Sequence, residues 1–303
     1  MKILFVRTGK AFLPEIDAYV KYFNKLEGFE AYDSQLLDEN YSIDDFDVIW
    51  EFKGFGGVRD VNKVIVHDYA SLSTGSFPKV KNNLKKWLNP KPNLRVFLNQ
   101  AVRQGFNFND DIEFCYRDMG IDERFLSVKS EEKEYDFVYV GSICKGRGMD
   151  RFLAEFTRKP QGKLCLIGNV EDDIYNEYKH NKDLVFTGSV PYGEVPIIAS
   201  KAVYGINYIP DKYPFNIQTS TKLLEYLALG LKVITTDYQW VRDFEKRHGC
   251  SFYKLNLKQD GFNRDYIKSY DYKSNFAVEN HLWDAVLENS GLKEKIRDIV
   301  CRE

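Results

Sequence analysis

Short apolar runs alternate along the chain with stretches in which apolar residues recur at helical spacing. In the first part of the sequence, the continuous apolar runs cover residues 3–6, 46–52, 64–67 and 94–98. Runs of this length are typical of strands that are buried on both faces of a parallel sheet. The helical pattern that follows the first run ends at Gly28. Residues 1–125 are therefore expected to form a small α/β domain.

The same pattern restarts at Asp136. The segment FVYVG predicts a strand, SICKGRG a glycine-bearing loop, and the residues after it a helix. Further strands are expected at residues 164–167, 185–187, 203–208 and 233–235. A second domain with a parallel, doubly wound sheet is thus predicted over residues 135–273. Two helices over residues 274–303 are expected to close the chain, and the charged stretch 116–133 to join the two domains.

Length and composition narrow the classes of protein that fit. The 303 residues suit two domains of about 150 residues each. The net charge of -2 gives no general attraction to nucleic acid, so no nucleic-acid partner is expected. Five cysteines without metal-type spacing indicate a reducing compartment. The opening MKILFVRTGK is too short for a signal peptide and no apolar run approaches the roughly 20 residues of a membrane span, so a cytoplasmic protein is expected.

The segment TSTKLLEYLALGLKVIT, residues 219–235, has the features of a phosphate site. Ser and Thr residues precede good helix formers, which predicts a side-chain-capped helix that ends at Gly230. The free backbone N–H groups and the positive end of the helix dipole would lie next to Lys222. Glu225, near the first turn, could accept hydrogen bonds from sugar hydroxyls.

The loop SICKGRG could supply the cations of the same site. It places Lys145 and Arg147 between Gly141 and Gly148, directly after a predicted strand. Glycines let the backbone approach a ligand, and two cations could neutralise a diphosphate. A solvated basic turn fits the loop equally well. The loop lacks the full G-x-G-x-x-G spacing, which argues against a nicotinamide-dependent dehydrogenase.

The order of these segments is more specific than any one of them. FVYVGSICKGRGMDRFL, KLCLIGNV, VFTGSVPYGEVPIIAS, INYIP and STKLLEYLALGLKVIT follow one another between residues 135 and 240. This order resembles the C-terminal domain of GT-B glycosyltransferases, especially the retaining, family 4-like enzymes (glycosyl transferases group 1). Upstream, RDMGIDERF resembles the hinge pattern between the two domains of that family.

The resemblance implies an α/β protein of the GT-B fold, with two Rossmann-like domains whose parallel sheets face a central cleft. It also implies a hexosyltransferase that moves a sugar from a nucleotide-diphosphate sugar to a glycan or lipid-linked acceptor, with retention, in bacterial-type surface polysaccharide or glycoconjugate synthesis. The N-terminal domain would contact the acceptor and the C-terminal domain the donor. UDP is favoured over GDP, the nucleotide sugar is a substrate, and neither a cofactor nor a metal is expected. The acidic pairs Asp44–Asp45, Asp110–Asp111 and Asp172–Asp173 are interpreted as solvated turns.

Residue by residue, the resemblance implies a donor site. Glu225 matches the family glutamate that binds the ribose, and Arg147 matches the lysine that contacts the diphosphate. The loop with Ser189, Val190 and Tyr192 would hold the base, and His67, at the end of the strand in VHDYAS, would contact the donor sugar. The expected catalytic residues are His67, Arg147 and Lys222. The expected donor-binding residues are Lys145, Val190, Ser220, Thr221 and Glu225.

Two positions depart from the family pattern. Many family members have a second glutamate where this chain has Ile217, and many have an arginine where it has Ser142. These departures suggest a catalytically silent GT-B-like binding subunit as an alternative. Within the same fold, an inverting GT-B transferase and a nucleotide-sugar epimerase are further alternatives.

The segment FPKVKNNLKKWLNPK suggests contact with a membrane. Its apolar residues fall on one helical face, with lysines alongside, over residues 79–88. A tryptophan at the boundary of such a face is typical of an interfacial helix that binds anionic lipid, which would place the protein at the inner face of the membrane. An amphipathic helix packed on its own domain is the alternative.

Overall fold

The computed structural model describes residues 1–7, 13–37, 41–59, 62–259 and 261–302. The chain divides into two compact units. The first unit comprises Met1–Gly120 together with Glu279–Glu303, and the second comprises Ile121–Val278. The last 25 residues by number therefore belong to the first unit, so the chain passes between the units twice.

The first unit contains a parallel sheet of six strands in the order β2-β1-β3-β4-β5-β6. Its strands are β1 (Lys2–Val6), β2 (Glu30–Asp33), β3 (Val48–Phe52), β4 (Val64–Tyr69), β5 (Leu94–Phe97) and β6 (Glu113–Tyr116). Strands β3, β4 and β5 are buried along their whole length, as their near-continuous apolar sequences predict. Registers such as Glu51↔His67 bring polar residues of neighbouring strands side by side within this buried layer.

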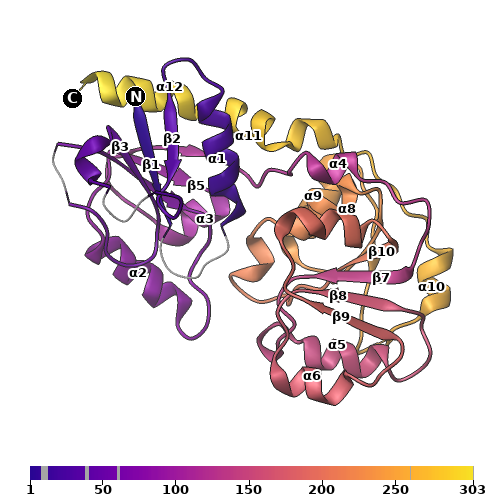
Figure 1. Ribbon diagram of the computed structural model, residues 1–303. Coiled ribbons are helices and arrows are strands. Elements are labelled where there is room, and N and C mark those ends of the chain that lie inside the picture. The colour runs from indigo at the N-terminus through magenta and orange to yellow at the C-terminus, as the bar shows by residue number, and fades with distance from the viewer. Residues whose placement is uncertain (8–12, 38–40, 60–61, 260, 303) are drawn as a thin grey trace. The chain divides into compact units, whose positions relative to one another are not determined.

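In the described part of the first unit, α-helices flank the sheet (Figure 1). They are α1 (Pro14–Asn24), α2 (Pro78–Leu88), α3 (Gln100–Phe106), α11 (Trp283–Asn289) and α12 (Leu292–Arg302), with the 3-10 turns η1 (Ile43–Asp45) and η5 (Val278–His281). The ring of Trp50 packs 5.1 Å from that of Phe5 and 5.0 Å from that of Tyr19. Helix α11 is tied to α1 by Tyr22, whose hydroxyl donates to Glu288 over 2.5 Å.

The second unit contains another parallel sheet of six strands, in the order β12-β11-β10-β7-β8-β9. Its strands are β7 (Tyr135–Val140), β8 (Leu164–Ile167), β9 (Leu184–Gly188), β10 (Ala202–Asn207), β11 (Lys232–Thr235) and β12 (Tyr253–Lys254). The chain extends the sheet in one direction from β7 and then returns to the other side of β7 with β10. The carboxyl ends of β7 and β10 therefore form the point at which parallel sheets bind ligands.

Helices cover both faces of the second sheet, with α5 and α6 on one side and α8 and α9 on the other (Figure 1). The helices are α4 (Arg124–Ser127), α5 (Met149–Phe156), α6 (Asp172–Tyr178), α7 (Val195–Ala199), α8 (Thr221–Ala228), α9 (Gln239–His248) and α10 (Arg264–Ser269), with 3-10 turns η2 (Lys145–Arg147), η3 (Tyr192–Glu194) and η4 (Phe215–Ile217). Helix α8 packs closely on β10 because Gly205 leaves room for the Tyr226 ring; a Cβ there would lie 2.4 Å from it. The two parallel sheets with flanking helices confirm the α/β class.

Candidate functional site

The N-terminus of α8 lies at the carboxyl edge of the second sheet, beside the ends of β7 and β10. The helix begins after Ser220 and ends before Gly230, which has a φ of 69°. The predicted side-chain cap is absent, because the Ser220 hydroxyl donates to Oδ1 of Asn207 at 2.8 Å instead of accepting from a helix N–H. The first turn of α8 is thus left without a side-chain acceptor, and its positive end can bind an anion.

A buried polar network fixes this helix start. The Asn207 amide, at the end of β10, donates to the hydroxyls of Thr235 and Tyr238 at 3.0 and 2.9 Å. Asn207, Ser220 and Thr235 are all at least nine-tenths buried. Since buried polar groups are costly when unpaired, the network resists any displacement of the loop that leads into α8.

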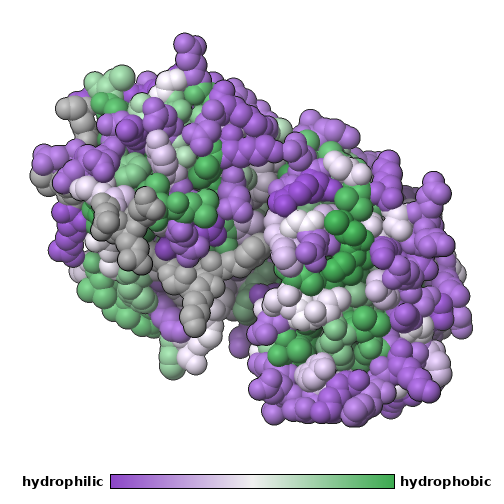
Figure 2. All heavy atoms as spheres, in the orientation of Figure 1, coloured by the Kyte–Doolittle hydropathy of each residue, from purple (hydrophilic) through white to green (hydrophobic). Residues whose placement is uncertain are grey.

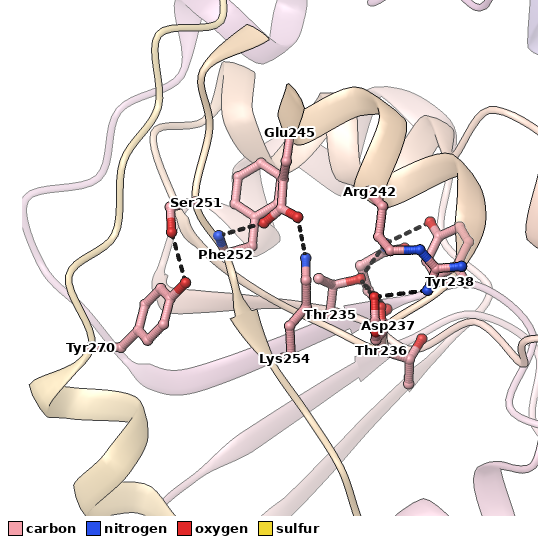
Figure 3. A network of polar contacts seen from close by, with 11 residues as sticks. Thr235, Thr236, Asp237, Tyr238, Arg242, Glu245, Ser251, Phe252, Lys254 and Tyr270 are labelled. Carbon is pink, nitrogen blue, oxygen red and sulfur yellow. Dashed lines mark hydrogen bonds and ion pairs between the residues drawn. The ribbon is translucent and has the colours of Figure 1, made fainter. Parts of the chain in front are cut away.

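The polar contacts continue along α9 (Figure 3). Arg242 donates to Asp237 at 3.0 Å. Glu245, further along the helix, accepts from Nζ of Lys254 at 2.6 Å and from the backbone N–H of Phe252 at 2.8 Å. These contacts connect α9 to β12 and to the segment that follows β11.

Lys222 holds its ammonium group inside the protein, above an aromatic ring. Nζ lies 4.1 Å from the centroid of the ring of Tyr139, the penultimate residue of β7. This nitrogen is buried and has no hydrogen-bond partner in the part of the chain that the structure describes. Burial, and after it the charge of Arg147, lowers the pKa of Lys222 well below its ordinary value. A buried, unpaired cation is unfavourable by itself and is suited to a ligand anion.

A glycine follows each of the strands β7 and β8 near this ammonium group. A Cβ on Gly141, after β7, would lie 3.3 Å from Nζ of Lys222. A Cβ on Gly168, after β8, would lie 2.3 Å from the carbonyl oxygen of Gly141, and its φ of 137° is one that L-residues rarely adopt. The absence of a side chain at Gly168 therefore allows the ends of β7 and β8 to approach each other here.

The two cations of the SICKGRG loop have different surroundings. Arg147, half-buried at the end of η2, is close enough to Lys222 to lower its pKa. Lys145 instead forms an ion pair of 2.6 Å with Asp173 of α6, and both side chains are largely exposed. The structure thus brings Arg147 and Lys222 together and directs Lys145 to the surface.

Glu225 lies one turn after Lys222 on α8 and is only 5% exposed. Burial raises its pKa to about 7, against the effects of Tyr192 and Lys222. The hydroxyl of Tyr192 donates to Oε1 of Glu225 at 2.7 Å. Val190, half-buried, lies in the same loop after β9 as Tyr192, and Thr221 is half-buried at the first residue of α8.

His67, the remaining predicted site residue, belongs to the first unit and has no exposed surface. Its Nε2 lies 3.3 Å from Oε2 of Glu51, and Lys53 lies 3.2 Å from the same oxygen. Burial lowers the pKa of His67, which favours the neutral ring. Glu51 and Lys53 are not among the predicted site residues, although Glu51 is a charged residue inside an otherwise apolar strand and Lys53 directly follows that strand.

A second buried polar cluster lies on the other face of the same sheet. Arg117 is fully buried and lies 3.2 Å from Asp68 and 3.3 Å from Glu15, which is at the start of α1. Tyr19 donates to Asp68 at 2.9 Å. Burial raises the pKa of Glu15. Among the described residues of either unit, no group of three or more His, Cys, Asp or Glu side chains is placed to hold a metal ion.

The apolar face of α2 is exposed. Trp87 is 83% exposed and Phe77, just before the helix, 77%. Val80, Leu84 and Leu88 are also among the exposed large apolar residues. Hydrophobic side chains gather over this helix in Figure 2. The residue of α2 that is buried is Asn82, which accepts from the N–H of Ser73 at 3.0 Å.

Comparisons with solved structures identify the fold. The sequence matches no protein-family model and no curated protein sequence. AviGT4, a glycosyltransferase of avilamycin A biosynthesis, is similar with a TM-score of 0.60 at 11% identity, over 99% of this chain and 98% of that one. Anabaena Alr3699/HepE, solved with UDP and glucose, is similar with a TM-score of 0.61 at 12% identity, over 100% and 98%.

Sucrose-phosphate synthase from Thermosynechococcus elongatus gives a TM-score of 0.62 at 11% identity, over 99% of this chain and 96% of that one. These likenesses extend over both units and establish that the chain has the GT-B fold of these glycosyltransferases.

Proposed function

We propose that the protein is a glycosyltransferase that takes a hexose from a nucleoside diphosphate sugar. The observation that carries the proposal is the buried ammonium of Lys222, which has no hydrogen-bond partner in the described chain and lies beside Gly141 at a helix N-terminus. A diphosphate would supply the missing negative charge. The similarity of this chain to solved glycosyltransferases supports the proposal, and one of those structures contains UDP and glucose.

The chemistry requires stabilisation of the departing diphosphate. As the bond from the sugar to the diphosphate breaks, negative charge accumulates on the leaving oxygen. Lys222, Arg147 and the N–H groups of the first turn of α8 are fixed before the reaction and would stabilise that charge without rearranging. Glu225 would accept hydrogen bonds from the ribose, and the loop around Val190 would contact the base, for which uracil is favoured.

A donor screen tests this proposal. The protein is incubated with UDP-, GDP-, ADP- and TDP-linked hexoses, and release of free nucleotide and thermal stabilisation are measured for each. We expect at least one donor to release nucleotide, with a Lys222→Met variant at least tenfold slower. Neither turnover nor stabilisation with any donor would overturn the proposal. The anomeric configuration of the product, determined by NMR, tests the expected retention against inversion.

We further propose that the acceptor is a lipid-linked glycan and that α2 docks on an anionic bilayer. The helix contains four lysines and no acidic residue, and its apolar residues are exposed rather than packed on their own unit. Exposed Trp87, beside Lys85 and Lys86, fits the boundary between lipid tails and headgroups. Within the described chain, no helix is both long and apolar enough to cross a membrane. Docking by α2 would place the protein at the cytoplasmic face, in glycoconjugate synthesis.

Sedimentation with vesicles tests the docking. We expect binding to vesicles of phosphatidylcholine with phosphatidylglycerol, little binding to phosphatidylcholine alone, and loss of binding in a Leu84→Ser, Trp87→Ser variant. Ile197→Ser is the matched control, because Ile197 is 51% exposed but lies on α7. Equal sedimentation of the α2 variant and the wild type would contradict docking through this helix.

A further inference from the structure

Tyr192 and Glu225 form a hydrogen bond between two different elements of the second unit. Tyr192 begins η3, in the loop after β9, whereas Glu225 lies on α8. The phenol hydroxyl donates to Oε1 of the carboxylate at 2.7 Å. The hydrogen bonds of the described residues include none to Oε2, so one oxygen of this carboxylate is occupied and the other is available to a ligand.

The ring of Tyr192 also packs near the start of α4. The Phe125 ring lies 5.6 Å from it, and the Arg124 guanidinium lies 5.4 Å from its centroid. The next residue is Gly193, where a Cβ would lie 2.7 Å from a guanidinium nitrogen of Arg124. These contacts leave the phenol little freedom, so its hydroxyl defines where Oε1 of Glu225 lies.

The hydrogen bond from the phenol of Tyr192 affects the ionisation of Glu225. Burial raises the pKa of Glu225 to about 7, and the hydrogen bond from Tyr192 is the largest effect that opposes the rise. Lys222, on the same helix, also opposes it, whereas Asp122 adds to it. Arg147 acts on Lys222, and Arg124 on Tyr192. Removal of the phenol hydroxyl would leave a buried carboxylate that takes up a proton at a higher pH.

We propose that Tyr192 is a positioning residue for nucleotide binding, whose phenol fixes Oε1 of Glu225 and leaves Oε2 to accept a hydrogen bond from a ribose hydroxyl. The inference rests on the proposed function, because it takes Glu225 as the ribose-binding carboxylate. Tyr192 does not contact the reacting atoms. It acts through Glu225, by orienting the carboxylate and by opposing the rise of its pKa above about 7.

The proposal predicts a specific pH dependence. A hydroxyl donates more strongly to a carboxylate than to a carboxylic acid, so nucleotide binding is expected to strengthen as the pH rises through about 7, the pKa of Glu225. In Tyr192→Phe the pKa of Glu225 rises further, and the same increase in affinity occurs at a higher pH. The variant therefore binds more weakly near pH 7 and approaches the wild type near pH 9.

Calorimetric titration with UDP, and with GDP if UDP does not bind, tests this between pH 6 and 9. We expect Tyr192→Phe to raise Kd by about fivefold at pH 7 and by less than about twofold at pH 9, because raising a pKa of about 7 by about one unit lowers the ionised fraction at pH 7 from about one half to about one tenth. Titration of the nucleotide itself cancels in the ratio of variant to wild type. Tyr175→Phe is the control, since it removes a phenol hydroxyl from α6 of the same unit.

The outcomes separate the two proposals. If the wild type binds neither nucleotide, the proposed function fails and the role of Tyr192 fails with it. If the wild type binds and Glu225→Gln binds more weakly, but Tyr192→Phe follows the wild type at every pH, then the role of Tyr192 alone is overturned. A constant loss of affinity in Tyr192→Phe across the whole pH range would show a merely structural effect and would also overturn it.

Discussion

The ammonium of Lys222 lies over the face of the Tyr139 ring, 4.1 Å from its centroid, with no hydrogen-bond partner in the described chain. The π face offsets part of the cost of burying the charge, but an aromatic ring is a weaker partner than an anion. The folded protein therefore carries an unfavourable local arrangement that a bound diphosphate would relieve.

Lys222→Met is expected to improve stability and impair binding at once. The change removes a buried charge while it keeps the apolar stem, so the unfolding temperature should rise. A charge-assisted hydrogen bond is worth about 2–3 kcal/mol, so Kd for UDP should rise by roughly a hundredfold. Thermal unfolding and calorimetry measure the two effects. Lys145→Met is the control, because Lys145 is paired with Asp173 at the surface and its loss should change Kd less than about twofold.

Glu225→Gln is expected to stabilise the protein in a pH-dependent way. Burial raises the pKa of Glu225 from 4.5 to about 7, so the folded state binds this proton more tightly than the unfolded state. The stability of the wild type therefore falls as the pH rises from the unfolded to the folded pKa, by on the order of 3 kcal/mol. Glu225→Gln has no carboxyl group at this position, so its stability does not fall in this way as the pH rises.

Chemical denaturation at two pH values measures the difference. At pH 8 the variant should have the larger free energy of unfolding, and at pH 4.5 the two proteins should be similar. The Tyr192 hydroxyl can still donate to the amide oxygen of the variant, so the comparison isolates the charge. A difference that is the same at both pH values would contradict the assigned pKa.

Gly168→Ala tests the close approach of the ends of β7 and β8. The new methyl group would collide with the carbonyl oxygen of Gly141, in a backbone conformation unfavourable to alanine. Gly188→Ala is the matched control, because Gly188 also has a positive φ, of 71°, but a Cβ there meets nothing within 4 Å. We expect the Gly168 variant to lose about 2 kcal/mol more free energy of unfolding than the control. Equal losses in a urea titration would show that the loops can separate.

Asn207→Ala is expected to loosen the start of α8. It leaves the hydroxyls of Ser220, Thr235 and Tyr238 without their shared partner, which should lower the free energy of unfolding by about 2–4 kcal/mol. Ser220→Ala removes a single bond and should cost about 1 kcal/mol. Urea denaturation measures both. An Asn207 variant as stable as the wild type would mean that the network does not hold this helix start.

The central strands and α8 could be predicted from sequence because their patterns are local. Three strands were missed: β2 (Glu30–Asp33), β6 (Glu113–Tyr116) and β12 (Tyr253–Lys254). All three are edge strands, which have only one neighbour and are less buried, so their sequences include charged residues that interrupt the apolar run. The apolar signal that identifies a central strand is correspondingly weak at an edge.

The types of residue in the candidate site could be predicted from sequence, but the hydrogen bonds and ion pairs that these residues form could not. The donor loop and helix identified Arg147, Lys222 and Glu225, yet the sequence gives no sign that Lys145 pairs with Asp173. Ser220 was expected to cap α8, and its hydroxyl donates to Asn207 instead. Both outcomes depend on which strand ends the sheet topology brings together.

The sequence pattern of α2 fitted both a packed and an exposed helix, and the structure shows its apolar residues exposed.

The division of the first unit between two distant stretches of sequence has a consequence for biosynthesis. Tyr22 and Lys25 of α1 bind Glu288 and Asp284 of α11, which the ribosome makes only after the whole of the second unit. The first unit therefore acquires helices α11 and α12 only after the second unit has been synthesised. The second unit, continuous from Ile121 to Val278, can complete its sheet earlier, which reverses the usual order in which domains fold during synthesis.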